Sequence, residues 1–347
     1  MAQAREKIHI DLDDIEQLFG LVEISHRLGD IGPETRKSIV YLIAKTLQVS
    51  IEERKAKRPK LRVSYLPEFS NELFKEGRPF AVEDQLFRID IYDFFAGLVA
   101  GVFDDLQKRR SRRDTIVTFN YDLVCEHALR RFGLSADYHL RSDLIDDQRE
   151  SPMHGQVDVL KLHGSTNWGI CEACNKRLVI LSNKVTDSPA EFEALQCPDC
   201  KRNGFVPLLI PPSWDKSGYA EIIAPVWKRA VEELKSATRI CIIGYSIPET
   251  DAFFKYLLTL ALAGNHQLYN LLVVDYRAPI FNHPLSLDVQ GHSRDLVRPR
   301  YLKLLDKLFR QRRFLYFDNG FADFLRGWAS RLHLDRAEML MKADCGW

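Results

Sequence analysis

The sequence lacks the features that would place it in a membrane or on a secretory route. It contains no run of roughly 18 apolar residues, so no transmembrane helix is predicted. Residues 1–10 are polar and do not form the apolar core of a signal peptide. We therefore expect a cytoplasmic protein with no membrane partner.

The chain also lacks an excess of charge of either sign. Its 49 Lys and Arg residues nearly balance 48 Asp and Glu residues, which gives a formal net charge of +1. A balance this close gives no global attraction to nucleic acid, and we predict no direct nucleic-acid binding. Hydrophobic residues make up 46% of the 347 positions, enough for one large domain or two smaller ones, and the composition excludes bulk disorder.

Apolar spacing predicts a helical start followed by alternating strands and helices. Residues 15–22 and 39–47 show helical periodicity on either side of a break at 29–33, and residues 87–102 repeat it. From residue 114, short β-branched runs alternate with helical patterns. The predicted strands are 115–119, 157–162, 206–210, 239–243, 271–274 and 314–317, and the predicted helices are 122–132, 222–234, 251–262, 301–310 and 321–332. Strands joined by such helices form a parallel sheet covered on both faces, so the fold class is α/β, Rossmann-like.

Four of the seven cysteines form two C-x-x-C pairs. The pairs are Cys171 with Cys174 and Cys197 with Cys200. Two such knuckles complete a tetrahedral four-sulfur site, which suits structural zinc because no coordination position stays open. The alternative is a redox dithiol or two unrelated pairs. The odd cysteine count argues against a disulfide framework, and we expect Cys125 and Cys241 to be small core residues.

Polar residues follow several predicted strands at their carboxyl ends, where open parallel sheets bind ligands. Asn120 and Asp122 follow the first strand, and His163 with Gly164 follows the second. A helix cap is the simpler reading of the first pair, and a hydrogen-bonded structural histidine that of the second.

Two later strand ends carry similar groups. Gly244 allows close backbone approach, and Ser246 with free N–H groups suits a phosphate. The alternative is that these residues form an ordinary turn. Asp275 can hold ribose hydroxyl groups or cap the next element.

The order of these features resembles the sirtuin family, and especially its prokaryotic sirtuin-like branch. Sirtuins show T-x-N-x-D after a strand, then H-G, an inserted four-cysteine zinc module and a G-x-S strand end. This chain shows Thr118-x-Asn120-x-Asp122, His163-Gly164, the cysteine pairs and Gly244-x-Ser246 in that succession, over roughly residues 114–330.

The resemblance implies NAD as ligand and cleavage of its nicotinamide–ribose bond. It implies that Asn120 positions the reactive ribose or water and that His163 is the general base. It implies further binding residues for the cofactor: Thr118, Asp122 for the nicotinamide carboxamide, Gly244 and Ser246 for the phosphates, and Asp275 for the adenosine ribose. In the prokaryotic branch the usual outcome is NAD hydrolysis in antiphage defence.

One element of the family pattern is absent from the sequence. Sirtuins carry a strand followed by a glycine-rich loop, G-A-G-x-S, and no such loop precedes Thr115. Two expectations follow: a shortened enzyme, or a member that no longer turns over NAD. The alternatives to an NAD hydrolase are therefore an inactive zinc-containing scaffold that binds a partner, and an NAD-dependent protein deacylase.

The resemblance also implies a division of the chain. We expect residues 1–113 to form a mainly helical N-terminal part, residues 114–167 and 205–347 the Rossmann-like NAD-binding core, and residues 168–204 an inserted zinc-ribbon module. As partners we expect further copies of the chain or a second protein, for example an ATPase of a defence system.

Overall fold

The structure, a computed structural model, describes residues 15–55, 60–63, 80–83, 86–101, 114–141, 145–147, 155–181, 189–210, 220–247, 252–275, 297–311 and 313–331. The chain divides into two compact units. The first unit comprises Met1–Lys57 with Arg113–Ala230, and the second comprises Arg58–Arg112 with Val231–Trp347. The predicted division at residues 113, 167 and 204 stays a prediction.

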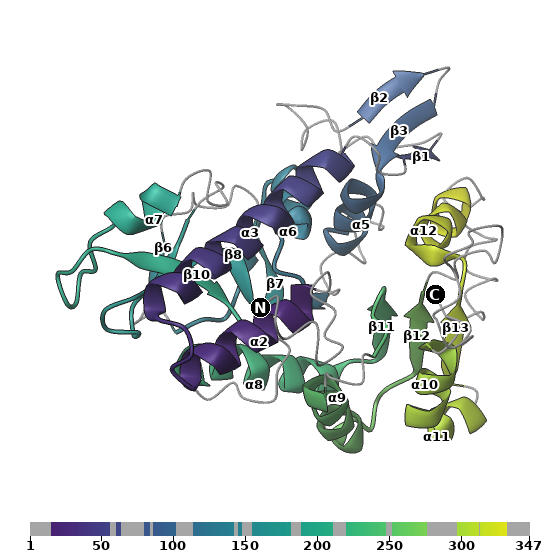
Figure 1. The fold of residues 1–347 in the computed structure, drawn as a ribbon. Coiled ribbons are helices and arrows are strands. Elements are labelled where there is room, and N and C mark those ends of the chain that lie inside the picture. Colours follow the sequence, from purple (N-terminus) through teal and green to yellow (C-terminus); the bar gives the residue numbers. More distant parts are fainter. Residues whose placement is uncertain are drawn as a thin grey trace, which may run out of the picture. The chain divides into compact units, whose positions relative to one another are not determined.

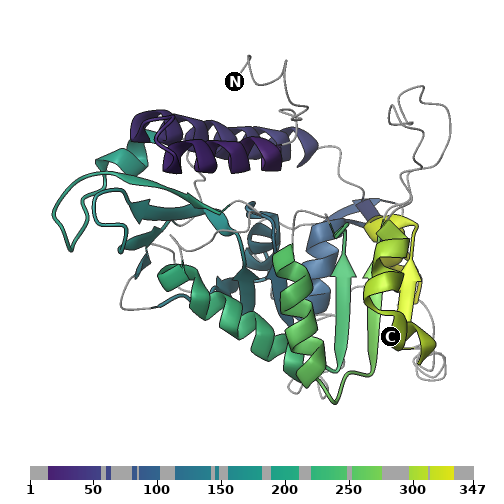
Figure 2. The same cartoon turned by 60° about the horizontal axis from the view of Figure 1, so that its bottom comes forward.

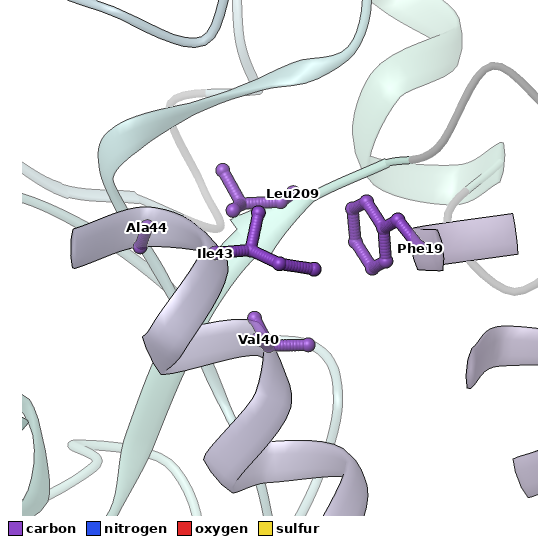
Figure 3. Packing of buried hydrophobic residues seen from close by; sticks show 5 residues of the cluster. All are labelled: Phe19, Val40, Ile43, Ala44 and Leu209. Carbon is purple, nitrogen blue, oxygen red and sulfur yellow. The ribbon is translucent and has the colours of Figure 1, made fainter. Parts of the chain in front are cut away.

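The first unit begins with two helices, α2 (Ile15–Arg27) and α3 (Pro33–Lys55), which lie side by side (Figures 1 and 2). Both were predicted from apolar spacing and are confirmed. Pro33 begins α3, where its missing N–H costs no helical hydrogen bond. The pair buries its apolar face against strand β10 (Phe205–Leu209), and Figure 3 shows the cluster: Phe19, Val40, Ile43, Ala44 and Leu209.

The first unit contains a three-stranded parallel sheet. Its strands are β4 (Thr115–Thr118), β7 (Gly155–Lys161) and β5 (Leu134–Asp137), in that order, with β7 in the middle. Helix α6 (Val124–Arg130) connects β4 to β5. The strands at 115–119 and 157–162 are thereby confirmed, and β5 is an addition that the sequence did not predict.

A second sheet of the first unit carries the cysteine pairs. Its order is β10-β8-β9-β6, with β6 (Ile145–Asp147), β8 (Gly164–Cys171) and β9 (Leu178–Ile180), and the short helix α7 (Pro189–Ala194) lies between β9 and β10 in the chain. The expectation that residues 206–210 belong to the parallel sheet is wrong, because β10 pairs antiparallel with β8. Both kinds of strand are continuous apolar runs when buried on two faces, so the pattern could not separate them.

The second unit contains another parallel sheet, in the order β11 (Arg239–Ile243), β12 (Asn270–Val274) and β13 (Phe314–Phe317). Helix α8 (Ala220–Ser236) precedes it, and α9 (Ala252–Gly264) connects its first two strands. All three strands were predicted. The helix expected at 301–310 is two helices, α10 (Val297–Leu304) and α11 (Asp306–Arg310), followed after β13 by α12 (Gly320–Arg331).

Three short strands of the second unit are an addition to the mainly helical N-terminal part that the sequence predicts. The strands β1 (Lys60–Val63), β2 (Phe80–Glu83) and β3 (Leu86–Asp90) form an antiparallel sheet, with β3 between the other two. The helix expected to include Phe87 begins only at Ile91, as α5 (Ile91–Val99), because the Asp90 carboxylate caps it by accepting the Tyr92 N–H at 2.9 Å.

The described cysteines agree in part with expectation. None of the six described cysteines is in a disulfide bond. Cys125 and Cys241 are half-buried rather than core residues, although burial of the Cys241 thiol is sufficient to raise its pKa. None of the described helices is long and apolar enough to cross a membrane.

Candidate functional site

The segment that follows β4 carries the first predicted group of site residues. The Thr118 Oγ1 accepts the Asn120 N–H at 3.1 Å, and the Asp122 Oδ1 accepts the Val124 N–H at 2.9 Å. The N-cap residue of α6 is Leu123, and Asp122, one residue earlier, satisfies the first N–H of the helix, which is close to the capping role that the simpler reading predicted. Asn120 is exposed, and its backbone N–H is held by Thr118.

His163 lies in a tight turn between β7 and β8 and is only 4% exposed. The Phe119 ring meets its imidazole edge-to-face at 5.0 Å between centroids, and the Tyr121 ring lies at 6.1 Å. These two aromatic residues flank Asn120 in the chain. The structure thus brings His163 and the Asn120 segment together at the carboxyl edge of neighbouring parallel strands, as the sequence predicted.

Gly164 has a structural role that the sequence did not reveal. Its φ of +82° lies in the left-handed region, and a Cβ there would sit 2.1 Å from the Leu208 carbonyl oxygen. Gly164 pairs with Leu209, next to an irregularity in the β8–β10 ladder. Only glycine allows this approach, so the Gly beside His163 is explained by strand pairing.

The residues after Gly164 form a buried polar network that sequence reasoning missed. Ser165, Thr166 and Asn167 are at most 1% exposed. The Thr166 N–H and hydroxyl both donate to the Tyr121 carbonyl, at 3.0 and 3.1 Å, and Ser165 donates to the Asn167 Oδ1 at 2.7 Å. Buried polar side chains need such partners, and these partners fix the backbone beside Asn120. A run of Ser, Thr and Asn inside an apolar strand was the available signal.

The second unit carries the remaining predicted residues at the carboxyl edge of its own parallel sheet. Gly244 has a φ of +64°, and its N–H donates to the Val274 carbonyl at 2.9 Å, which places it beside Asp275. Ser246 is exposed, and its carbonyl accepts from the Arg300 guanidinium at 3.4 Å. The structure therefore brings Gly244, Ser246 and Asp275 to one edge.

Asp275 lies near two tyrosine hydroxyl groups, those of Tyr316 and Tyr301. Its Oδ2 accepts the Tyr316 hydroxyl at 2.9 Å, and its carbonyl accepts the Gly320 N–H at 2.7 Å. Burial, followed by the charge of Asp275, raises the pKa of the Tyr301 phenol well above its usual range. The Tyr301 hydroxyl therefore stays protonated, and it donates to the Tyr245 carbonyl at 2.6 Å. Tyr316 and Tyr301 are contacts that the sequence did not predict.

The four paired cysteines of the first unit meet at one point. Their sulfur atoms lie within 4.8 Å of one another, with 3.6 Å between Cys171 and Cys200 and 3.9 Å between Cys174 and Cys197. A tetrahedral zinc with sulfur at about 2.3 Å would space its ligands about 3.8 Å apart, so the set fits zinc.

The backbone around the first knuckle also suits a thiolate. Burial opposes ionisation of Cys174, but the N–H groups of Arg177 and Lys176 and the neighbouring thiols of Cys171 and Cys197 lower its pKa to about 7, whereas burial raises the pKa of the adjacent Cys171 to about 12. Donors aimed at sulfur stabilise the deprotonated form that binds a metal. The four cysteines could therefore hold a zinc ion.

These features define an α/β protein with parallel sheets, polar groups at their carboxyl edges and a four-cysteine cluster. A family model described as SIR2-like domain matches residues 114–288, half of the chain, and the chain belongs to this family. It is thus a member of the sirtuin-like superfamily, for which NAD is the typical ligand, and its parallel sheets fit the Rossmann-like fold expected from the sequence. No curated protein matches the chain.

Proposed function

We propose that the chain is an NAD⁺ glycohydrolase. The observation that carries this proposal is the packing of His163 against Phe119 and Tyr121, on either side of the exposed Asn120, in a chain of the SIR2-like family. A histidine beside a surface amide at the edge of a parallel sheet supplies a proton acceptor and a hydrogen-bonding group at one place.

The proposed reaction breaks the bond between the nicotinamide nitrogen and C1′ of its ribose. The bonding electron pair goes to the pyridinium nitrogen, which becomes neutral, and a water oxygen bonds to C1′. Asn120 orients the ribose or the water, and His163 accepts a proton from a ribose hydroxyl group or from the water. The products are nicotinamide, ADP-ribose and a proton released to solvent.

The other predicted residues are proposed as NAD-binding groups, each within its own unit. In the first unit, Thr118 shapes the backbone before Asn120, and Asp122 would meet the nicotinamide carboxamide with the oxygen that does not accept the Val124 N–H. In the second unit, the Gly244 N–H is already bonded to the Val274 carbonyl, so Gly244 would contribute close backbone approach and Ser246 the N–H for a phosphate group, and Asp275 would accept ribose hydroxyl groups.

A direct assay tests the proposal. Purified full-length chain is incubated with NAD⁺, and nicotinamide and ADP-ribose are separated and quantified. We expect equal amounts of the two products and a calorimetric signal for NAD⁺ binding. A chain that neither binds NAD⁺ nor releases nicotinamide, alone or with a co-purifying partner, overturns the proposal.

The non-enzymatic alternative is a zinc-containing scaffold that binds a partner. Two contacts favour it, because the carboxylates of Asp122 and Asp275 already have partners within the chain, Val124 and Tyr316. Calorimetry that finds tight binding of a co-purified protein and no heat with NAD⁺ would select this alternative. A role in antiphage defence, with a second copy or an ATPase as partner, belongs to the glycohydrolase proposal and is tested by phage challenge of cells that carry wild-type or His163-substituted protein.

We further propose that Cys171, Cys174, Cys197 and Cys200 bind a structural zinc. The support is the sulfur spacing and the burial of Cys171 and Cys197. Four thiolates close the coordination shell, so the ion would hold the knuckles together and take no part in bond cleavage.

A further inference from the structure

Lys161 is a buried charge at the end of the central strand of the first unit. It is the last residue of β7, and 1% of it is exposed. A lysine is almost never buried this fully unless its ammonium group is paired, since an unpaired buried charge is very unfavourable. The position of this lysine therefore requires an explanation from its contacts.

Both contacts of the ammonium group lie in the segment that follows β4. The Lys161 Nζ donates to the Asp122 carbonyl oxygen and to the Glu126 Oε1, the latter at 2.9 Å. Glu126 belongs to α6, and Thr118 is the neighbour of Lys161 across the β4–β7 ladder. Lys161 thus connects the central strand to the start of α6 and to the backbone directly before it.

The same short segment is held from a second side. The Tyr121 carbonyl accepts both Thr166 bonds, and the next carbonyl, that of Asp122, accepts Lys161. Two consecutive carbonyl groups are therefore fixed by buried donors, while the Asn120 side chain just before them is exposed. A fixed backbone that presents an exposed amide is the arrangement a substrate-orienting residue needs, because small displacements of such a group cost rate.

We propose that Lys161 is a positioning residue for Asn120. Its ammonium group holds the backbone of the Asn120–Asp122 segment in the geometry that presents the Asn120 amide to substrate, and Glu126 balances its charge. This inference rests on the proposed NAD⁺ chemistry, which it deepens by assigning the support of the reacting site to a buried ion pair.

The test uses the full chain and three variants. In Lys161→Met the ammonium is replaced by an apolar group of similar length, and in Lys161→Met with Glu126→Gln no buried carboxylate is left uncompensated. Lys303→Met removes an exposed lysine from α10 and is the matched control. Two readouts are taken: amide hydrogen exchange of peptides covering residues 119–124, β4 and β7, and kcat with KM for nicotinamide release.

We expect the double variant to show about tenfold faster exchange confined to residues 119–124. Its kcat should fall by about tenfold or more while KM changes less than about twofold, because only the orientation of the reacting group is lost. Lys303→Met should match wild type in both readouts.

Unchanged exchange at 119–124 would overturn the inference, as would faster exchange there with unchanged kcat. Equal loss of protection across β4 and β7 would also overturn it, because it indicates a purely structural role. Failure of the proposed function is distinguishable, since wild-type protein would then show no nicotinamide release at all. In that case exchange confined to residues 119–124 still decides whether Lys161 fixes this segment.

Discussion

Gly164 lies so close to Leu208 that a Cβ atom added to the glycine would stand 2.1 Å from the Leu208 carbonyl oxygen. Real Cβ atoms do not approach a backbone oxygen this closely, and the φ of +82° at Gly164 adds the strain of a left-handed conformation. Strand pairing between β8 and β10 thus requires a glycine directly after His163, independently of any ligand.

Gly164→Ala should therefore destabilise the chain strongly. We expect the free energy of unfolding to fall by about 3 kcal/mol, because β8 or β10 must shift in addition to the backbone strain. The matched control is Gly244→Ala, where φ is +64° but no atom lies within 4 Å of the added Cβ, so only about 1–2 kcal/mol of backbone strain is expected. Chemical denaturation of both variants measures the difference, and equal losses would contradict the prediction.

Replacing His163 or Asn120 should abolish NAD⁺ turnover without unfolding the chain. His163→Gln keeps much of the buried volume but removes the base, so nicotinamide release should fall by about 10²–10⁴-fold. Because Asn120 is exposed, Asn120→Ala should leave the melting temperature unchanged while lowering kcat. Product quantification and thermal melts check both, with His266→Gln, an exposed histidine, as control. Full activity of His163→Gln would remove this residue from the reaction.

Metal analysis should find about one zinc per chain, bound by four thiolates. Cys174→Ser should lose most of the metal and lower the melting temperature, because a structural zinc contributes folding free energy. Cys125→Ser alters a cysteine outside the cluster and should keep the metal. A strong chelator should reproduce the Cys174→Ser melt in wild-type protein. Metal-free protein with an unchanged melting temperature would contradict the prediction.

The thiol of Cys241, in β11, should make stability fall at high pH. Its burial raises the pKa from 9.0 to about 12. Between these values the unfolded chain loses the thiol proton and the folded chain keeps it, so the folded state binds more protons. Stability is fully present below pH 9 and falls by about 1.4 kcal/mol per pH unit as the pH rises toward 12. Melting curves of wild type and Cys241→Val at pH 8.5–10.5 should diverge, and parallel curves would refute the assignment.

Two neighbouring residues of α3 should differ sharply in their effect on stability. Ile43 is 3% exposed and belongs to the cluster of Figure 3, whereas Leu42 is 63% exposed. Ile43→Ala leaves a cavity against Leu209 and should cost about 2–5 kcal/mol. Leu42→Ala should change the free energy of unfolding by less than about 0.5 kcal/mol. Denaturant titrations compare them, and similar losses would show that the exposed face of α3 is covered in solution.

Much of the fold could be predicted because the spacing of apolar residues along the chain reflects which side chains are buried. The strands at 239–243 and 314–317 were placed to the residue, since each is a β-branched or aromatic run bounded by polar residues. The break at 29–33 followed from Gly and Pro chemistry. The antiparallel place of Phe205–Leu209 and the small sheet at 60–90 could not be predicted in the same way, because strand pairing depends on partners distant in the chain.

In the candidate site, too, residues marked by local sequence patterns could be predicted, and residues defined by distant contacts could not. Asn120, His163, Gly244 and Asp275 could be singled out because they directly follow predicted strands, and parallel strands end at a shared edge where ligands bind. Lys161 was not recognisable. A lysine inside a strand pattern says nothing of a buried ammonium, and its partners Asp122 and Glu126 lie about 35–39 residues earlier in the chain.

By itself, the sequence determined the α/β class, most helix positions, six of the thirteen described strands, the two cysteine knuckles and the polar residues at the strand ends. These follow from hydrophobic periodicity, backbone chemistry and local spacing, which act over a few residues. Only the tertiary structure decided that His163 packs between Phe119 and Tyr121, that the residue after it must be glycine, and that Lys161 supports the Asn120 segment. Contacts of this kind join residues that are far apart in the chain and leave no periodic pattern in the sequence, so they are known only once the chain is folded.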